Sequence, residues 1–158
     1  MPSNLTTNAI GYINSPIGWL KVCANQSGLT SIDFDATPEP SQGNIHTQQA
    51  VVELTEYFAG QRQVFSVPLR PSGTKFQQNV WQALTRIPFG KTCSYLDIAL
   101  AINNPKAVRA VGAANGRNPI PIIVPCHRVI GRDGSLIGFS GGLDKKEWLL
   151  KHEGALLI

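Results

Sequence analysis

The hydrophobic pattern of this chain changes once, and the change limits the folds that the chain can adopt. Three short apolar and β-branched runs, at residues 9–15, 18–25 and 28–35, predict strands. A single amphipathic helix pattern follows at 45–60. Beyond a proline-containing crossing, the pattern is helical as far as Pro119. We therefore expect an α/β chain, with a small N-terminal α/β domain at residues 1–70 and a mostly helical C-terminal domain at residues 71–158.

Capping residues mark where the predicted helices of the second part begin. Thr74 and Ser94 each stand three residues before a Gln or an Asp that can complete a capping box. Pro105 suits the first position of a helix, and Asp144 can cap the last one. The predicted helices span residues 75–87, 95–102, 105–116 and 145–154. The two middle helices have the spacing of a helix-turn-helix unit, although ordinary helical hairpins give the same signal.

The positive charge of the chain is concentrated in its second part. The formal net charge is +4. Residues 1–70 carry three basic and five acidic side chains, a balance of −2, whereas residues 71–158 carry eleven and five, a balance of +6. A polyanion such as DNA would therefore meet the second part. A solvated basic face without a partner would show the same excess.

The number and spacing of the cysteines indicate the cellular compartment. Cys23, Cys93 and Cys126 are odd in number and widely spaced, which suits neither a disulfide framework nor a zinc site. We interpret Cys23 and Cys93 as small buried hydrophobes. The apolar runs are too short to cross a bilayer, and the first 15 residues lack the pattern of a signal peptide. We therefore expect a cytoplasmic protein with free thiols and no metal.

Cys126 stands in a different context from the other two cysteines. The apolar run 122–124 predicts a buried strand, which Pro125 would end because proline has no N–H to donate. His127 and Arg128 follow directly. A reactive cysteine needs nearby positive charge or a base that lowers its pKa. In extended chain successive side chains point to opposite faces, so either the backbone turns after Pro125 or a water joins thiol and imidazole.

A catalytic imidazole also needs a group that orients it. The candidates are Asp133, Asp144 and Glu153, and their spacing alone does not choose among them. The glycine-rich segment 131–142 favours a functional interpretation, because such a loop can approach a ligand closely. The alternative is a buried structural cysteine beside a histidine that hydrogen-bonds the backbone.

The third predicted helix has an unusual composition. Basic residues Lys106, Arg109 and Arg117 alternate with small ones. The small residues are Ala107, Ala110, Gly112, Ala113 and Ala114. Small side chains let a helix lie close to a partner, which can be either its own core or the groove of a nucleic acid.

The motif "PCHRV" at 125–129 resembles the active-site motif of the O6-alkylguanine-DNA alkyltransferases, the methylated-DNA–protein-cysteine methyltransferases. The resemblance extends over about residues 74–154, through "FQQNVWQAL", "IPFGKTCSY", "NPKAVRAVGAANGRNPIPIIVPCHRVIG" and "SGGLDKKEWLLKHEG". It implies a ribonuclease-H-like N-terminal domain and a C-terminal domain with a winged-helix or helix-turn-helix unit. It also implies single-turnover transfer of an alkyl group from O6-alkylguanine, and from O4-methylthymine, in DNA to a cysteine, without a cofactor.

The same resemblance assigns a role to each matching residue. Cys126 accepts the alkyl group, and His127 takes the thiol proton through a water while Glu153 orients the imidazole. Asn118 holds the turn around the site. Tyr95 donates a hydrogen bond or proton to guanine N3 as the base leaves. The pocket for the alkylated base is implied to include Val129, Phe139 and Ser140.

The implied partner is double-stranded DNA, bound in the minor groove without sequence preference by a monomer, and the sequence leaves open whether monomers bind DNA cooperatively. Arg109 would fill the space that the flipped base leaves. The other residues implied at the DNA are Ala110, Gly112, Ala113, Ala114, Arg117 and Arg128. One departure is Phe139, which stands where some members have tyrosine and leaves the breadth of alkyl substrates open.

Three other functions compete with this interpretation. A non-catalytic protein that binds alkylation damage would lack the acceptor, so the presence of Cys126 argues against it. A cysteine hydrolase using Cys126 and His127 would turn over many times on a small substrate. A plain helix-turn-helix regulator would prefer one DNA sequence.

Overall fold

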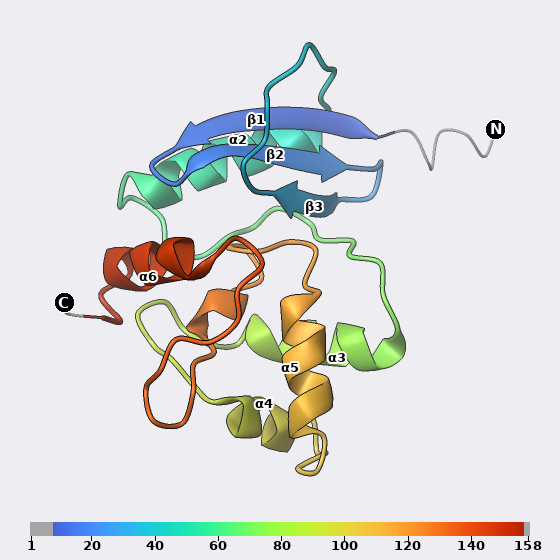
Figure 1. Cartoon of the computed structure of the whole chain (residues 1–158). Helices are drawn as coiled ribbons and strands as arrows, with labels where there is room; N and C mark the ends of the chain where they lie inside the picture. The colour runs from blue at the N-terminus through green and yellow to red at the C-terminus, as the bar shows by residue number, and fades with distance from the viewer. Residues whose placement is uncertain (1–7, 157–158) are drawn as a thin grey trace. The chain divides into compact units, whose positions relative to one another are not determined.

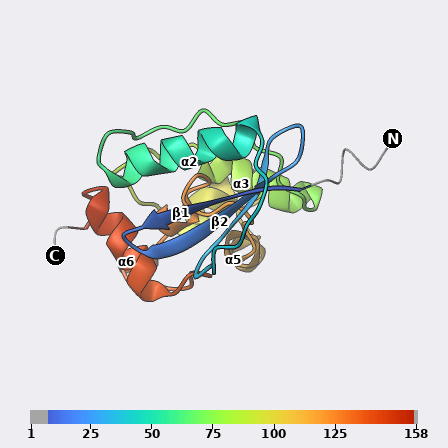
Figure 2. The same ribbon diagram turned by 90° about the horizontal axis from the view of Figure 1, so that it is seen from above.

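The first of the two structural units is a small sheet with one helix. The computed structural model describes residues 8–156, and these divide into two units after Ser72. In the first unit, strands β1 (Ala9–Ser15), β2 (Gly18–Ala24) and β3 (Leu29–Asp33) form an antiparallel sheet in the order β1-β2-β3. Helix α2 (Ile45–Phe58) lies along one face of this sheet (Figures 1 and 2).

Packing between α2 and the sheet makes the core of the first unit. Leu20 and Val22 of β2 and Leu54 and Tyr57 of α2 are fully buried. A Cβ atom added at Gly11 would come within 3.4 Å of Val51 on α2, so the absence of a side chain lets the helix lie close to β1. These residues alternate along the strands and repeat at helical spacing, which is why the pattern predicted this unit.

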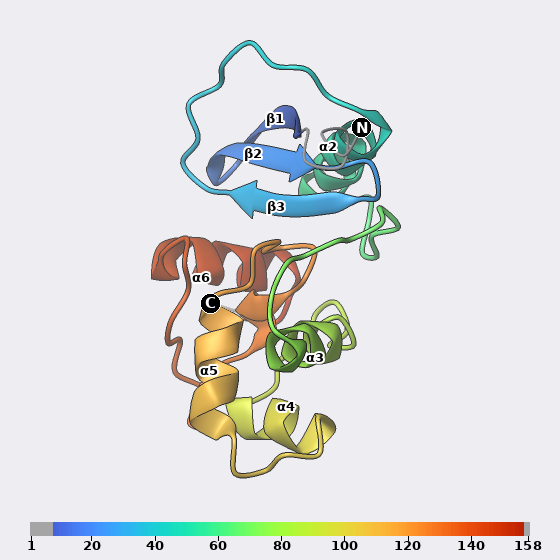
Figure 3. The same cartoon turned by 90° about the vertical axis from the view of Figure 1, so that its right-hand side faces the viewer.

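The second unit is built from helices joined by turns (Figure 3). Helix α3 (Lys75–Leu84) and helix α4 (Tyr95–Ala101) begin at the predicted capping boxes of Thr74 and Ser94. Helix α5 (Val108–Gly116) packs against both. The indole Nε1 of Trp81 on α3 donates a hydrogen bond of 2.8 Å to the Ala114 carbonyl of α5. The short 3₁₀ turn η1 (Cys126–Arg128) and helix α6 (Leu143–His152) complete the unit.

Two predicted helix starts are wrong by a few residues. Helix α5 begins at Val108 rather than at Pro105, because residues 102–107 form a longer turn in which Asn103 has a φ of 59°. Helix α6 begins at Leu143, and its N-cap is Gly142 with a φ of 101°. Asp144 lies within the first turn instead of capping it. Glycine suits the cap because an L side chain disfavours that φ.

The predicted strand at 122–124 is also wrong. These residues are buried, but Ile122 has a φ of 75° and the backbone turns, with the Val124 N–H bonded to the Ile120 carbonyl at 2.9 Å. The flanking prolines Pro119 and Pro121 lack the N–H donors of a sheet ladder. A buried turn and a buried strand share the same apolar composition, so the run alone did not distinguish them.

Within residues 8–156, every helix is too short or too polar to cross a membrane.

Candidate active site

The buried turn that precedes η1 is held by Asn118. Its Nδ2 donates to the Val124 carbonyl at 2.8 Å, and its Oδ1 accepts from the Ile120 N–H at 3.0 Å. The amide side chain therefore bridges the two sides of the turn. Asn118 is buried, so these bonds are protected from competition with water. This arrangement fixes where the chain enters η1.

Cys126 occupies the first position of η1. Pro125 has φ and ψ of −81° and 64°, and the Cys126 N–H bonds the Val124 carbonyl at 2.8 Å, which is the geometry of an inverse γ-turn. The backbone thus turns after Pro125. Cys126 is 3% exposed. Burial raises the pKa of its thiol to about 11, although Asn118 and Lys146 act in the opposite direction.

His127 is joined to Glu153, which follows α6 directly. The imidazole Nε2 lies 2.8 Å from Glu153 Oε2, and both side chains are fully buried. Burial lowers the pKa of His127 and outweighs the contribution of Glu153, so the ring is neutral at neutral pH. The second ring nitrogen, Nδ1, is buried and has no hydrogen-bond partner among residues 8–156.

The structure chooses among the three candidate carboxylates. Asp133 is exposed and accepts a hydrogen bond from the Ser135 N–H, and Asp144 is exposed in the first turn of α6. Glu153 alone of the three meets His127. Burial would raise the pKa of the Glu153 carboxyl, but hydrogen bonds from His127 and Arg128 outweigh it and lower the pKa to about 2. Glu153 is therefore ionised at neutral pH.

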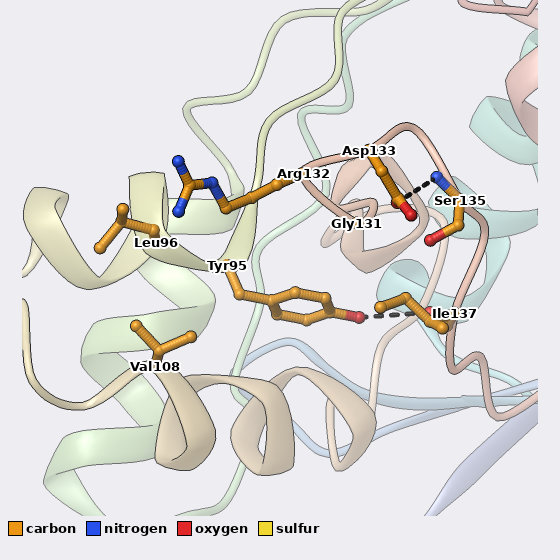
Figure 4. Close-up of a pocket in the computed structure, with 8 residues that line it drawn as sticks. All are labelled: Tyr95, Leu96, Val108, Gly131, Arg132, Asp133, Ser135 and Ile137. Atoms are coloured by element: carbon orange, nitrogen blue, oxygen red, sulfur yellow. Dashed lines mark hydrogen bonds between the residues drawn. The ribbon is translucent and has the colours of Figure 1, made fainter.

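Tyr95 stands at the start of α4 beside the glycine-rich loop. Its hydroxyl donates to the Ile137 carbonyl at 3.2 Å. Burial raises the pKa of the phenol, and proximity to Cys126 adds to the effect. The ring and Ile137 border a pocket of about 670 Å³ between α4, the start of α5 and the loop (Figure 4).

Lys146 is a site residue that the sequence reasoning missed. It is fully buried on α6, and its Nζ donates to the Val129 and Ile137 carbonyls at 2.7 and 2.9 Å. Burial lowers the pKa of its ammonium to about 8. The sequence did contain a pattern that places Lys146 on the buried face of this helix. The residues on that face recur at helical spacing: Lys146, Leu149, Leu150 and Glu153. A lysine on the apolar face of an amphipathic helix indicates a buried ammonium with a specific role.

The residues expected at DNA divide into an exposed and a buried set. Arg109, Ala110, Ala113 and Arg117 are exposed on or just after α5, and Gly112 is half-buried against Tyr95. Ala114 is buried in the contact with α3. A buried side chain cannot line a DNA surface, so we remove Ala114 from the predicted interface.

Arg128 is removed from the predicted DNA interface for the same reason. Its side chain is 7% exposed, and its Nε donates to Glu153 Oε1 at 2.8 Å. The guanidinium is thus occupied inside the protein. Phosphate groups of DNA would have no access to it.

The three residues predicted for the base pocket do not line the pocket of Figure 4: Val129 precedes the loop, and Phe139 and Ser140 lie in its second half. Val129 is buried, and its carbonyl accepts from Lys146. Phe139 is half-buried and Ser140 is exposed. Within the described residues, no cluster of three or more His, Cys, Asp or Glu side chains could hold a metal ion.

Together, a buried thiol directly before a histidine–carboxylate pair, and two packed helices α4 and α5 with an exposed arginine, fit the class of DNA-binding proteins that act through a cysteine. The family model described as "6-O-methylguanine DNA methyltransferase, DNA binding domain" matches residues 75–155. The model of the ribonuclease-like domain of the same family matches residues 9–71. The chain belongs to the 6-O-methylguanine DNA methyltransferase family.

Curated relatives and solved structures agree with this assignment. The methylated-DNA–protein-cysteine methyltransferase of Mycobacterium leprae is 50% identical over 89% of this chain and 89% of its own length. That of Methanosarcina barkeri is 46% identical over 89% of this chain and 94% of its own. The crystal structure of Mycobacterium tuberculosis OGT in complex with DNA matches with a TM-score of 0.82 and 47% identity, over 91% of each chain.

Proposed function

We propose that Cys126 is the acceptor through which this family member repairs O6-alkylguanine in DNA by direct reversal. The observation that carries the assignment is the placement of the Cys126 thiol on a rigid turn directly before the His127–Glu153 pair. In the reaction a bond forms between Sγ and the alkyl carbon, and the bond from that carbon to O6 breaks. The resulting thioether is stable, because a thiolate is a poor leaving group from an alkyl carbon, so each molecule reacts once.

A base must take the thiol proton, because burial keeps the pKa of Cys126 at about 11. His127 Nδ1 is suited to this role, since it is buried without a partner among the described residues and the ring is neutral. Buried polar atoms normally have a partner, often a water. A water between Sγ and Nδ1 would satisfy Nδ1 and carry the proton from thiol to imidazole.

Tyr95 would supply the hydrogen that the leaving guanine needs. As the C–O6 bond breaks, the electron pair moves onto the purine ring, and a donor at N3 stabilises this charge. The raised pKa of the phenol keeps Tyr95 protonated and able to donate. In the free protein its hydrogen is used on the Ile137 carbonyl, so the entering base must displace that bond. Val129, Phe139 and Ser140 would surround the base and its alkyl group.

DNA would meet the exposed side of α5. A base reaches a buried sulfur only when it leaves the stack, and Arg109, which is exposed on α5, would fill the gap. Ala110, Gly112 and Ala113 would allow close approach in the minor groove, and Arg117 would contact phosphate. Contacts to phosphate are independent of sequence, as repair of damage at any site requires. The solved complex of the M. tuberculosis relative with DNA supports this proposal by analogy.

Three finer points belong to the same proposal. O4-methylthymine would be a second substrate, because it also carries an alkyl group on a ring-carbonyl oxygen. The protein would act as a monomer that can bind DNA cooperatively. A cytoplasmic location is supported by three cysteines without a disulfide among the described residues.

The assignment of Cys126 is tested by single substitutions of the three cysteines. Each variant is mixed with duplex DNA that carries a radiolabelled O6-methylguanine, and label on the protein is counted. Cys126→Ser should take up no label, whereas Cys23→Ser and Cys93→Ser should be labelled like the wild type. Label on Cys126→Ser would show that another residue is the acceptor. Tight binding without label in any protein would favour the non-catalytic damage-binding alternative.

A further inference from the structure

The guanidinium of Arg128 is hydrogen-bonded to both oxygens of Glu153. Its Nε donates to Glu153 Oε1 at 2.8 Å, and one terminal nitrogen donates to Oε2 at 3.0 Å. The other terminal nitrogen donates to the Ile87 carbonyl at 2.6 Å, and the ring centroid of Phe89 lies 5.9 Å from the guanidinium carbon. Arg128 thus holds both oxygens of the carboxylate in a forked pair. Its own position is fixed by contacts with the turn that follows α3.

The ionised state of Glu153 determines which nitrogen of His127 carries the hydrogen. A carboxylate can only accept hydrogen bonds, whereas a neutral imidazole has one donor and one acceptor nitrogen. Because Nε2 lies 2.8 Å from Glu153 Oε2, Nε2 must be the donor. Nδ1 is then left with a lone pair, and it is the ring nitrogen that has no partner in the part of the chain that the structure describes. This is the tautomer that can take a proton from the thiol side.

Removal of the guanidinium would reverse this arrangement. Glu153 would become a buried carboxyl without its forked cation, and burial favours the neutral form. A neutral carboxyl carries a hydrogen that it can donate to Nε2. The imidazole hydrogen would then reside on Nδ1, which could no longer accept a proton.

We propose that Arg128 is a positioning residue of the relay, which holds Glu153 ionised and aimed at His127 and thereby selects the tautomer whose Nδ1 accepts the Cys126 proton. This inference rests on the proposed transfer to Cys126. Lys146 from α6 is a second cation near His127, and its Nζ binds the backbone carbonyls of Val129 and Ile137. We therefore assign the selection of the tautomer to Arg128 and not to Lys146.

The experiment compares Arg128→Met with the wild type in two readouts. One is the ¹⁵N NMR spectrum of the His127 imidazole, which reports the tautomer. The other is the rate and pH profile of alkyl transfer, measured with duplex DNA and with free O6-benzylguanine. Arg86→Met is the matched control, because Arg86 is exposed and lies outside the site.

The wild type should carry the hydrogen on Nε2, and Arg128→Met should carry it mainly on Nδ1. Transfer from both substrates should fall by about 10²-fold in Arg128→Met, as expected for loss of a general base. Arg86→Met should match the wild type. Retention of the Nε2–H tautomer in Arg128→Met would overturn the proposal, and so would slowing with duplex DNA alone, which would indicate a DNA contact.

If Arg128→Met does not fold, Arg128→Lys tests the same role of Arg128. It retains the charge but loses the forked geometry, so it should show a mixture of tautomers and a rate between those of the wild type and a Glu153→Gln variant. If Arg128→Lys has the tautomer and the rate of the wild type, the forked pair of hydrogen bonds to Glu153 does not select the His127 tautomer. Failure of the proposed function itself would look different, because the wild type would then transfer no alkyl group to Cys126 while its His127 tautomer could still be read.

Discussion

Cys126, His127 and Glu153, to which we assign the chemistry, are all buried, but their side chains are held in different states. The thiol is held on a γ-turn, the imidazole is neutral, and the carboxylate is ionised by its two donors. The sequence supplied Cys126 and His127 as neighbours, but Glu153 lies 26 residues away from His127. Spacing left three carboxylates open, and only the resemblance to the alkyltransferases favoured Glu153 before the structure was considered.

Glu153 gives a prediction about acid stability. Its carboxyl pKa is lowered from 4.5 to about 2. A group with a lowered folded-state pKa stabilises the fold above its ordinary pKa, and this contribution is lost as the pH falls from about 4.5 to about 2. The difference corresponds to roughly 3 kcal/mol in the free energy of unfolding. Urea unfolding of the wild type between pH 5 and pH 2.5 should show most of this loss.

A Glu153→Gln variant serves as the reference for that measurement. It should be less stable than the wild type at pH 7, since Arg128 loses its anionic partner, and its stability should change less over the same acid range. It should also transfer alkyl groups more slowly, with the thiol pKa of Cys126 raised. Equal acid dependence in the two proteins would show that Glu153 is not the group that titrates.

At the scale of elements, capping residues were better guides than apolar runs. The boxes at Thr74 and Ser94 were read correctly, because each satisfies backbone donors that a helix start leaves open. The run at 122–124 was misread as a strand because apolar composition reports burial and not backbone direction. The start of α6 was misplaced because the chain uses Gly142, whose positive φ no side-chain pattern reveals.

The loop between Ile130 and Gly142 gives a second prediction. Two side chains from outside the loop, Tyr95 and Lys146, donate to the same Ile137 carbonyl. When an entering base displaces Tyr95, the ammonium of Lys146 would keep the loop in place. Lys146→Met should therefore raise hydrogen exchange of the Gly131 and Gly142 amides by about tenfold or more, because an anchoring contact worth about 1.4 kcal/mol is lost.

Lys151→Met is the matched control, since Lys151 is exposed on the same helix and pairs with Glu147 at 2.7 Å. It should leave loop exchange unchanged. If exchange in the loop is the same in Lys146→Met and in the wild type, the buried ammonium does not anchor the loop.

Helix α5 gives a third prediction through Arg109. Base flipping costs a few kcal/mol, and each 1.4 kcal/mol corresponds to about a factor of ten in rate. Arg109→Ala should therefore slow repair of O6-methylguanine in duplex DNA by about tenfold or more. Its reaction with free O6-benzylguanine should be nearly unchanged, because that base needs no flipping. Equal slowing with both substrates would remove Arg109 from its role at the DNA.

For the whole chain, the sequence predicted the α/β class and the family. The structure supplied the hydrogen-bond network of the site. The division into an N-terminal sheet unit and a helical unit follows from one change of hydrophobic period. The burial of Arg128 could not be read in the same way, because charged residues are usually exposed. The burial of Lys146 was indicated only by its place on the apolar face of α6. Their roles depend on contacts between segments far apart in sequence, which local patterns do not report.

The most direct test of alkyl transfer to Cys126 is the intact mass of the protein after reaction with a duplex that contains one O6-methylguanine. We expect a gain of one methyl group, which maps to the peptide containing Cys126 and stops at one per molecule. The DNA should contain an intact guanine afterwards. No change in mass despite binding to the damaged duplex, or a methyl group on a different residue, would contradict alkyl transfer to Cys126.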